Sequence, residues 1–182
     1  MILRLIPEKV ILQILRDCMY GLQCLHSQSV VHRDIKPQNL FLRDGRVKIG
    51  DLGVAATFTA STGQQTCTGT VQYMAPEMIK GEPYAFSADI WSLGCVFAQL
   101  VNRFPLFPED SEISTLFSIF QYSLYLSFRH RKLGTPDEST WPGISQLEDY
   151  SPLYPKFPQR SIGVHVPALD PVGVDLLSVR FL

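Results

Sequence analysis

Apolar and polar positions repeat with two different periods along the first fifty residues. Between Pro7 and His26, apolar side chains recur every three to four residues, the spacing that lines one face of an α-helix. Pro7 suits the first turn of that helix, where a backbone N–H is not needed. The pattern then changes to that of short strands, which we expect at Val30–His32, Leu40–Leu42 and Val47–Ile49.

The Asp44-Gly45 pair stands between the second and third of these strands. Both residue types tolerate the positive φ angles of a tight hairpin turn, so the pair predicts a β-hairpin. Small strand pairs beside a long helix indicate an α+β fold that is mainly α. We find no internal repeat and no second domain.

Helical periodicity returns in the second half of the chain. We expect helices at Asp89–Leu100 and Glu112–Phe120, and a last helix from near Val172. Residues Thr57–Thr70 are small and polar, which predicts a mobile loop. Beyond Gly134 the chain is punctuated by prolines and reads mainly as loop.

Composition excludes several classes of protein. The chain has 182 residues, of which 46% are hydrophobic and 18% charged, so it can bury a core and is not intrinsically disordered. Its 16 basic and 17 acidic residues give a formal charge of -1. That balance argues against a nucleic-acid binder and against a polybasic membrane-surface protein.

The cellular compartment is indicated by the absence of a membrane-spanning stretch, a secretory signal and a metal-binding or paired cysteine pattern in this sequence. The longest apolar stretch, Ile90–Val101, is too short to cross a bilayer, and the N-terminus does not resemble a secretory signal. Four scattered cysteines show no metal-ligand spacing and read as reduced thiols: Cys18, Cys24, Cys67 and Cys95. We therefore expect an intracellular protein of the cytoplasm, the nucleus or both.

Three short motifs occur in a fixed order. The segment His32–Leu40, HRDIKPQNL, is followed by Asp51-Leu52-Gly53 and then by Ala75-Pro76-Glu77. Their order and spacing resemble the catalytic loop, metal-binding loop and activation-segment end of eukaryotic protein kinases. The resemblance runs from about residue 3 to the end of the chain. It implies a kinase-like C-terminal lobe in which small β-hairpins carry the catalytic and metal-binding loops.

The chemistry of these residues agrees with the resemblance. Phosphoryl transfer needs an acceptor hydroxyl aimed in line and metal ions that neutralise phosphate charge. The resemblance implies that Asp34 accepts or orients the hydroxyl proton and that Lys36 contacts the transferred phosphoryl group. It makes Asn39 and Asp51 oxygen ligands for Mg²⁺, with ATP as the phosphoryl donor. An isolated Asp or Asn at these positions would read as a turn cap.

Further residues have supporting roles in the resemblance. Thr70 resembles the threonine that bridges the catalytic aspartate and lysine in serine/threonine kinases, and Lys36 argues against a tyrosine kinase. Asp89 resembles the aspartate that braces the catalytic loop, although a helix N-cap is a second interpretation. His32 and Glu77 are expected to be structural.

Arg33 precedes the catalytic aspartate, which in this family accompanies control by phosphorylation of the activation loop. A phosphothreonine would bring charge that arginine can hold in a bidentate pair. Thr66 is the best-placed acceptor and Thr68 the second, while an unmodified polar loop is the alternative.

Later segments resemble cyclin-dependent kinases: Phe107–Ile113, Leu133–Pro136, Trp141–Gly143, Tyr154–Phe157 and Val166–Asp170. By resemblance, the partners would be protein substrates and a cyclin-like regulatory subunit. Three positions depart from that group. Met74 and Ala56 stand where it carries arginines, which weakens the case for strict proline-directed specificity. Leu52 replaces the commoner phenylalanine and is expected to fill the same apolar slot.

The sequence shows no glycine-rich loop, no lysine on a third strand and no helix with a paired glutamate. We therefore expect residues 1–182 to be a partial kinase domain, without the N-terminal lobe and with its last helices truncated. Residues Tyr122–Arg131 interrupt the family pattern, either as a helix extension or as a segment foreign to the domain. The alternative to a kinase is a non-catalytic lobe that binds partners. A domain cut short at Leu182 would lack the arginine that pairs with Glu77.

Overall fold

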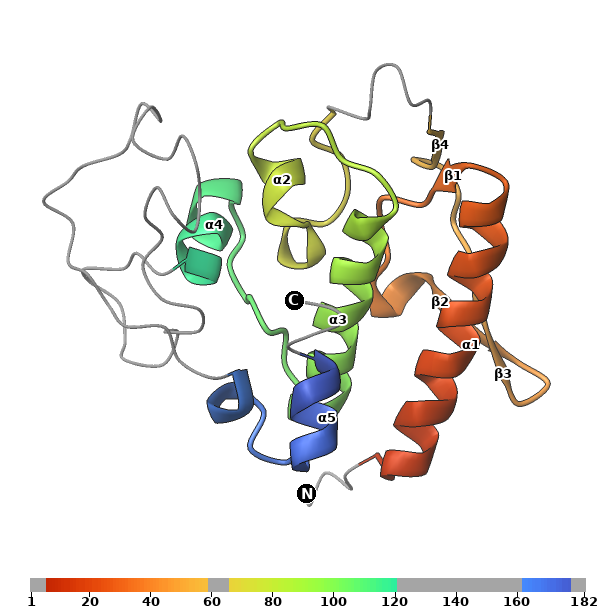
Figure 1. Cartoon of the computed structure of the whole chain (residues 1–182), viewed down its shortest axis with the longest axis vertical. Coiled ribbons are helices and arrows are strands. Elements are labelled where there is room, and N and C mark those ends of the chain that lie inside the picture. Colours follow the sequence, from red (N-terminus) through yellow and green to blue (C-terminus); the bar gives the residue numbers. More distant parts are fainter. Residues whose placement is uncertain (1–5, 59–65, 121–161, 178–182) are drawn as a thin grey trace, which may run out of the picture.

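The computed structural model describes residues 6–58, 66–120 and 162–177. In these ranges the helices are α1 (Glu8–Ser27), α2 (Pro76–Ile79), α3 (Ser87–Asn102), α4 (Glu112–Phe120) and α5 (Pro171–Leu176) (Figure 1). The strands are β1 (Val30–Val31), β2 (Leu40–Arg43), β3 (Arg46–Ile49) and β4 (Ala56–Thr57). Short 3-10 turns are η1 (Pro37–Asn39), η2 (Val71–Tyr73) and η4 (Ile162–His165). This helix-rich chain with two small antiparallel strand pairs confirms the α+β prediction.

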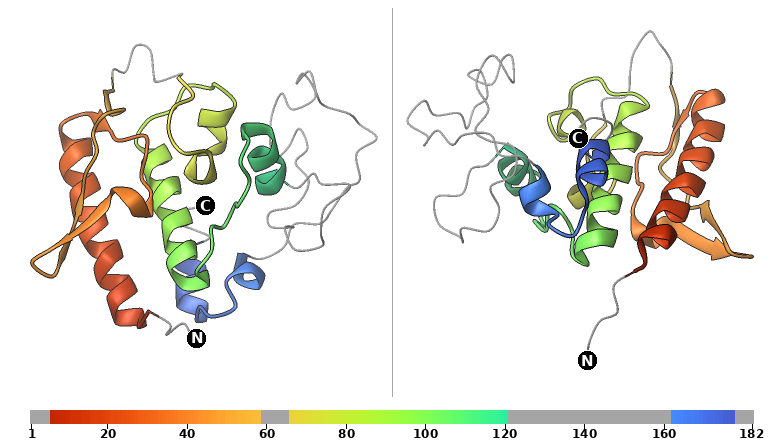
Figure 2. Two further views of the ribbon diagram at one scale, coloured as in Figure 1. Left: turned by 180° about the vertical axis from the view of Figure 1, so that it is seen from behind. Right: turned by 60° about the horizontal axis from the view of Figure 1, so that its bottom comes forward.

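Helix α3 lies at the centre of the fold, with α1 on one side of it and α2, α4 and α5 on the other (Figures 1 and 2). The side of α1 that faces inward carries its buried residues, among them Leu15, Cys18 and Leu22. Helix α3 is buried over most of its length. Each fully buried large apolar side chain contributes about 1.5–3 kcal/mol, so packing around α3 is a major source of the stability of this fold.

The predicted hairpin forms between β2 and β3. Leu40 pairs with Ile49 and Arg43 with Arg46, so that Asp44 and Gly45 make the turn. Both turn residues have positive φ, 53° and 71°, as the sequence pattern required. The hairpin packs against α1.

The other strand pair differs from expectation. Strand β1 pairs with β4 through Val30 with Thr57 and Val31 with Ala56, whereas Thr57 was predicted to lie in a loop. A two-residue strand is too short to show a period, and its partner is remote in sequence.

The segment Tyr122–Arg131 lies outside the described residues.

Helix α3 begins earlier than its periodicity predicts. Its N-cap position is occupied by Phe86, so Asp89 lies within the first turn, and the interpretation of Asp89 as an N-cap is wrong. Helix α4 has the predicted bounds, α1 agrees within one residue at each end, and α5 begins one residue before the predicted start. All four cysteines carry free thiols. No helix in the described ranges is long and apolar enough to cross a membrane.

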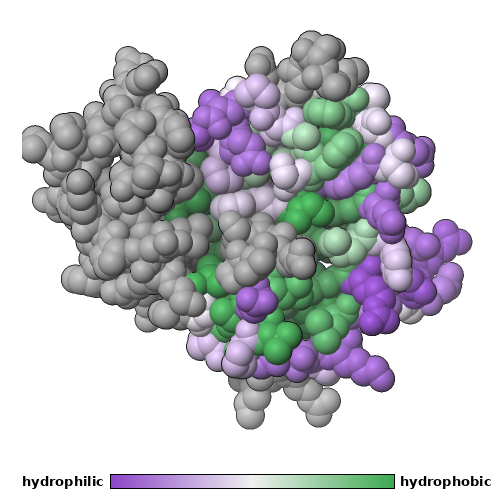
Figure 3. Space-filling model, viewed as in Figure 1, coloured by the Kyte–Doolittle hydropathy of each residue, from purple (hydrophilic) through white to green (hydrophobic). Residues whose placement is uncertain are grey.

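Apolar surface remains on the face seen in Figure 3, over its middle, where α3 lies between α1 and α5. A hollow of about 740 Å³ lies on α1 beside α3. Its lining residues are Arg16, Met19, Tyr20, Leu22, Gln23, His26, Ser27 and Ile90. Among them, Met19 and Tyr20 are large apolar side chains that are exposed to solvent.

A buried carboxylate joins α1 to the hairpin. Asp17 accepts hydrogen bonds from the backbone N–H of Val47 at 2.9 Å, from Arg46 Nε at 2.8 Å and from Gln13 at 2.9 Å. The Val47 hydrogen bond, together with the Arg46 guanidinium, holds the pKa of Asp17 below its ordinary value although burial opposes this. The carboxylate is therefore the form that the folded state prefers.

This preference predicts a pH-dependent contribution to stability. Asp17 should stabilise the fold fully at neutral pH and lose that effect as the pH falls below about 4, towards its lower folded-state pKa. Urea unfolding measured from pH 7 to pH 3 should show Asp17→Asn less stable than wild type at pH 7, with the gap closing in acid. Asp44→Asn, at a side chain that is 92% exposed, should follow the wild-type curve. A gap that stays constant with pH would contradict the assignment.

Candidate functional site

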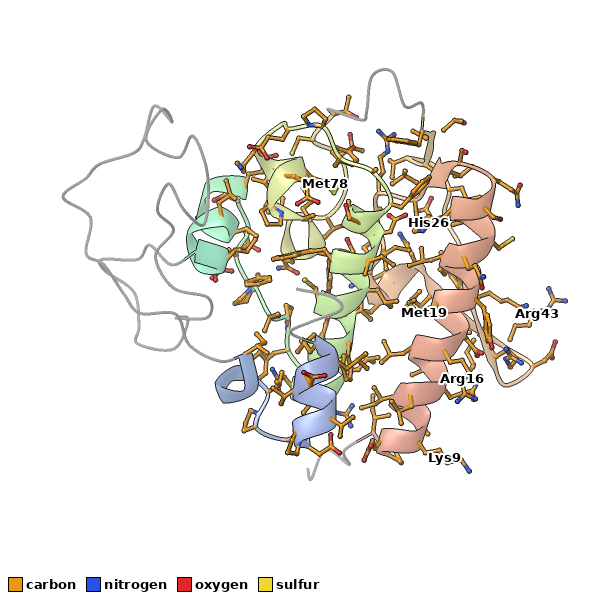
Figure 4. The ribbon with its side chains drawn as sticks, viewed as in Figure 1. Lys9, Arg16, Met19, His26, Arg43 and Met78 are labelled. Atoms are coloured by element: carbon orange, nitrogen blue, oxygen red, sulfur yellow. The ribbon has the colours of Figure 1, made fainter. Side chains whose placement is uncertain are left out.

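One buried carboxylate, that of Asp89, binds the segment between β1 and η1. Asp89 in α3 is fully buried and accepts hydrogen bonds from the backbone N–H groups of His32 and Arg33, each at 2.9 Å. A third bond comes from Nε2 of His26 at 2.8 Å. His26 lies on the side of α1 that faces α3 (Figure 4). Three donors from two segments thus fix the start of the HRD motif.

His32 links this segment to the second motif. Its Nε2 lies 3.0 Å from the carbonyl oxygen of Gly50, and its Nδ1 lies 3.2 Å from the backbone nitrogen of Asp34. Because a carbonyl accepts and an N–H donates, only the tautomer with its proton on Nε2 satisfies both contacts. The fully buried ring therefore sets the spacing between Asp34 and the residue after Gly50, which is Asp51.

Asp34, Lys36 and Thr70 form a closed triangle of polar contacts. Lys36 Nζ lies 2.7 Å from Asp34 Oδ2 and donates to Thr70 Oγ1 at 2.8 Å, while Thr70 Oγ1 donates to Asp34 Oδ1 at 2.7 Å. Partial burial by itself raises the pKa of Asp34, but the hydrogen bonds from Lys36 and Thr70 and the charge of Lys36 outweigh it and lower the pKa below its ordinary value. Asp34 is thus a carboxylate at neutral pH, within reach of an ammonium group and a hydroxyl.

Asn39 connects the triangle to Asp51. Its Nδ2 donates to the backbone oxygen of Asp34 at 2.8 Å and to Asp34 Oδ2 at 3.1 Å. Its backbone oxygen accepts from Gly50 N at 2.9 Å, which extends the β2–β3 ladder to the residue before Asp51. With both amide bonds made through nitrogen, the side-chain oxygen of Asn39 is left to act as a ligand.

Asp51 has a left-handed backbone, with φ 59°, and its Oδ1 accepts from Gly53 N at 3.2 Å. No group of three or more His, Cys, Asp or Glu side chains gathers anywhere in the described part of the chain. Mg²⁺ is commonly held by one or two protein oxygens and completed by substrate phosphates and water, so Asn39 and Asp51 fit this ion.

The segment that carries Thr70 approaches the HRD motif at a glycine. Gly69 has φ 130°, and a Cβ placed on it would lie 2.4 Å from the backbone oxygen of Arg33. Any larger residue would push Thr70 away from Asp34. The sequence gives no signal of this requirement, because a glycine beside a threonine does not indicate a close approach without the fold.

Arg33 also contacts the segment between the DLG motif and Ala75-Pro76-Glu77, which the resemblance implies is the activation segment. Its Nε donates to the carbonyl oxygen of Val54 at 2.6 Å, and its Nη1 donates to Thr66 Oγ1 at 2.8 Å. Arg33 itself has φ 70°, an unusual backbone conformation for a residue with a side chain. Thr68 makes no comparable contact among the described residues.

Other candidate residues lie outside this cluster. Glu77, in the first turn of α2, has no ion pair within the described ranges. Met74 is buried in a small cluster with Ala75, Met78, Tyr84 and Ala88. Leu52 is 53% exposed, so the expectation that it fills an apolar slot is wrong for this structure.

Two further residues of this region, His26 and Tyr84, could not be predicted from the sequence. The helical pattern ends at His26, and no motif includes Tyr84. Their partners, Asp89 and Thr66, are 63 and 18 residues away in the sequence, and no local pattern signals such contacts.

Together, the site offers an ionised proton acceptor, a cation beside it and two oxygen ligands for a metal ion. A comparison with protein families agrees with that chemistry. The model of the protein kinase domain matches residues 2–151, which is more than half of the chain. This polypeptide therefore belongs to the protein kinase domain family, whose members are transferases that use ATP and Mg²⁺.

Proposed function

We propose that this protein is a serine/threonine kinase of the cyclin-dependent-like type, which transfers the γ-phosphoryl group of ATP to a protein hydroxyl. The observation that carries the proposal is the triangle of Asp34, Lys36 and Thr70, joined through Asn39 to the Asp51 loop. A family match alone would be satisfied by a degenerate site. The triangle supports a site that retains its catalytic groups.

In this proposal the oxygen of the substrate hydroxyl bonds to the γ-phosphorus of ATP, and the bond between the γ-phosphorus and the oxygen of the β-phosphate breaks. Asp34 accepts the proton that the hydroxyl loses. Its lowered pKa keeps it ready to orient that hydroxyl. Lys36 neutralises charge on the transferred group while its contact with Asp34 holds it in place. Asn39 and Asp51 would hold Mg²⁺, which supplies further charge neutralisation.

Serine/threonine specificity is supported by Lys36 and Thr70. The lysine occupies a position where the tyrosine-kinase catalytic loop differs, and the threonine bridges it to Asp34. Buried Met74 offers no charge for a proline-binding pocket, so we expect no strict requirement for proline after the phosphorylated residue.

Regulation by phosphorylation is proposed at Thr66, with Thr68 as a second acceptor. Arg33 already donates to the Thr66 hydroxyl and would hold a phosphate there as a charge-assisted pair. Ala56, in β4, supplies no second cation, so we expect modest ordering of the segment. The proposed partners are protein substrates and a cyclin-like subunit, in the cytoplasm or nucleus.

A second function, a non-catalytic binding lobe, is favoured by one observation. Phe41 and Leu42 on β2 are 54% and 76% exposed, so each face of this strand presents a large apolar side chain that a partner could cover. ATP binding distinguishes the two functions.

We expect the full chain to show a thermal shift with ATP that depends on Mg²⁺, and Asp51→Asn to abolish it by removing a charged ligand. Asp44→Asn, a carboxylate loss in the exposed hairpin turn, is the matched control and should keep the shift. Differential scanning fluorimetry with and without EDTA gives the measurement. No shift in wild type, together with retained binding of partner peptides, would favour the binding lobe instead.

A further inference from the structure

We propose that Tyr84 is a positioning residue for the activation segment, because its hydroxyl fixes the backbone of Thr66 so that the Thr66 side chain faces Arg33. This inference rests on the proposed regulation at Thr66 and adds to it a residue outside the three motifs. Tyr84 lies between α2 and α3 and is 3% exposed.

Two hydrogen bonds hold Thr66 at opposite ends. The Tyr84 hydroxyl donates to the backbone oxygen of Thr66 at 2.8 Å. On the side-chain end, Arg33 Nη1 donates to Thr66 Oγ1 at 2.8 Å. A carbonyl held in this way limits rotation of the peptide plane that follows Thr66, and it limits the positions of the Thr66 Cα and the side chain attached to it.

Both anchors are themselves rigid. The Tyr84 ring packs in the buried cluster with Met74, Met78 and Ala88, so its hydroxyl has little freedom to move. Arg33 is fixed by its backbone bond to buried Asp89 and by its Nε bond to a carbonyl. Thr66 therefore spans two fixed points, while its own side chain is exposed to a modifying enzyme.

The consequence concerns a phosphate on Thr66. A phosphothreonine held against Arg33 is shielded from attack, and the shielding requires the backbone to stay where Tyr84 holds it. Without the Tyr84 hydroxyl, the carbonyl is free to turn and the phosphate spends more time away from Arg33.

The test uses the full chain carrying phosphothreonine at position 66, installed during synthesis, and a promiscuous phosphatase. Tyr84→Phe removes one oxygen and keeps the ring. We expect it to speed dephosphorylation about fivefold, the factor that corresponds to one ordinary hydrogen bond. Arg33→Met should also speed the reaction, and the double variant should be no faster than Arg33→Met alone.

A matched control is Tyr73→Phe, which removes another buried phenolic hydroxyl, one that donates to Gln99 at 2.6 Å. A general loss of stability would act in both variants, whereas loss of positioning acts only in Tyr84→Phe. Dephosphorylation of Tyr84→Phe at the wild-type rate would overturn the proposal, as would effects of Tyr84→Phe and Arg33→Met that simply multiply.

A second measurement needs no substitution. The hydroxyl proton of Tyr84 should exchange slowly enough to appear in the NMR spectrum of wild-type protein, whereas that of Tyr20, whose side chain is exposed, should not. Fast exchange at Tyr84 would overturn the hydrogen bond itself. Neither assay requires turnover by this chain. A failed ATP-binding test would refute the kinase function, whereas the role of Tyr84 would still be decided by the dephosphorylation and proton-exchange assays.

Discussion

Replacing Asp34 with asparagine is expected to lower the rate of phosphoryl transfer about 100- to 10,000-fold, the range for loss of a positioned general base. Asparagine keeps the shape of the side chain and an oxygen that can accept from Thr70. It cannot accept the substrate proton, and it removes the charge that holds Lys36 at 2.7 Å. The loss should therefore appear in the rate of the transfer step while the fold is retained.

The measurement is transfer of labelled phosphate from ATP to a serine-containing protein acceptor under single-turnover conditions. Because the pKa of Asp34 lies below its ordinary value, the wild-type rate should not fall through this group between about pH 8 and pH 6. Asp44→Asn should match wild type. Activity that survives Asp34→Asn would mean that another group accepts the proton, or that a contaminating kinase supplies the signal.

Replacing Asp89 with alanine is expected to destabilise the fold by about 3–5 kcal/mol, because three donors lose their acceptor inside the protein. The backbone N–H groups of His32 and Arg33 and the Nε2 of His26 would all be left without a partner. The same change releases the start of the HRD motif, so we expect it to reduce ATP-dependent activity as well.

Urea unfolding of the Asp89→Ala protein at neutral pH measures the loss in free energy. Asp89→Asn, which keeps one acceptor oxygen, should fall between Asp89→Ala and wild type. Asp110→Ala, at an exposed carboxylate, should leave the unfolding midpoint unchanged. If Asp89→Ala unfolds like wild type, the three hydrogen bonds do not support the loop and the account of the site is wrong.

Local patterns predicted the parts of the fold that are local. The amphipathic spacing predicted α1, and the Asp44-Gly45 pair predicted the hairpin turn, because each depends on residues within a few positions of one another. Strand β4 was missed because two residues cannot show a period and its partner β1 lies far away in the sequence.

The candidate site shows the same division. The resemblance of the HRD and DLG motifs to those of protein kinases implied the roles of Asp34, Lys36, Asn39 and Asp51 before the fold was known. The sequence left two interpretations of Asp89 open, a brace for the catalytic loop and a helix N-cap, and it could not show that Leu52 would be exposed. Both outcomes depend on what surrounds a side chain in space.

The sequence by itself determined the chemistry available to this protein, because a carboxylate, an ammonium and an amide keep their properties wherever they stand. Tertiary structure alone decided which of these groups meet. Gly69 lets the activation segment approach Arg33, His26 reaches Asp89 from another helix, and Tyr84 holds Thr66. Such contacts form because packing around α3 brings distant segments to within hydrogen-bond distance, and the strength of a hydrogen bond depends on that distance and not on separation along the chain.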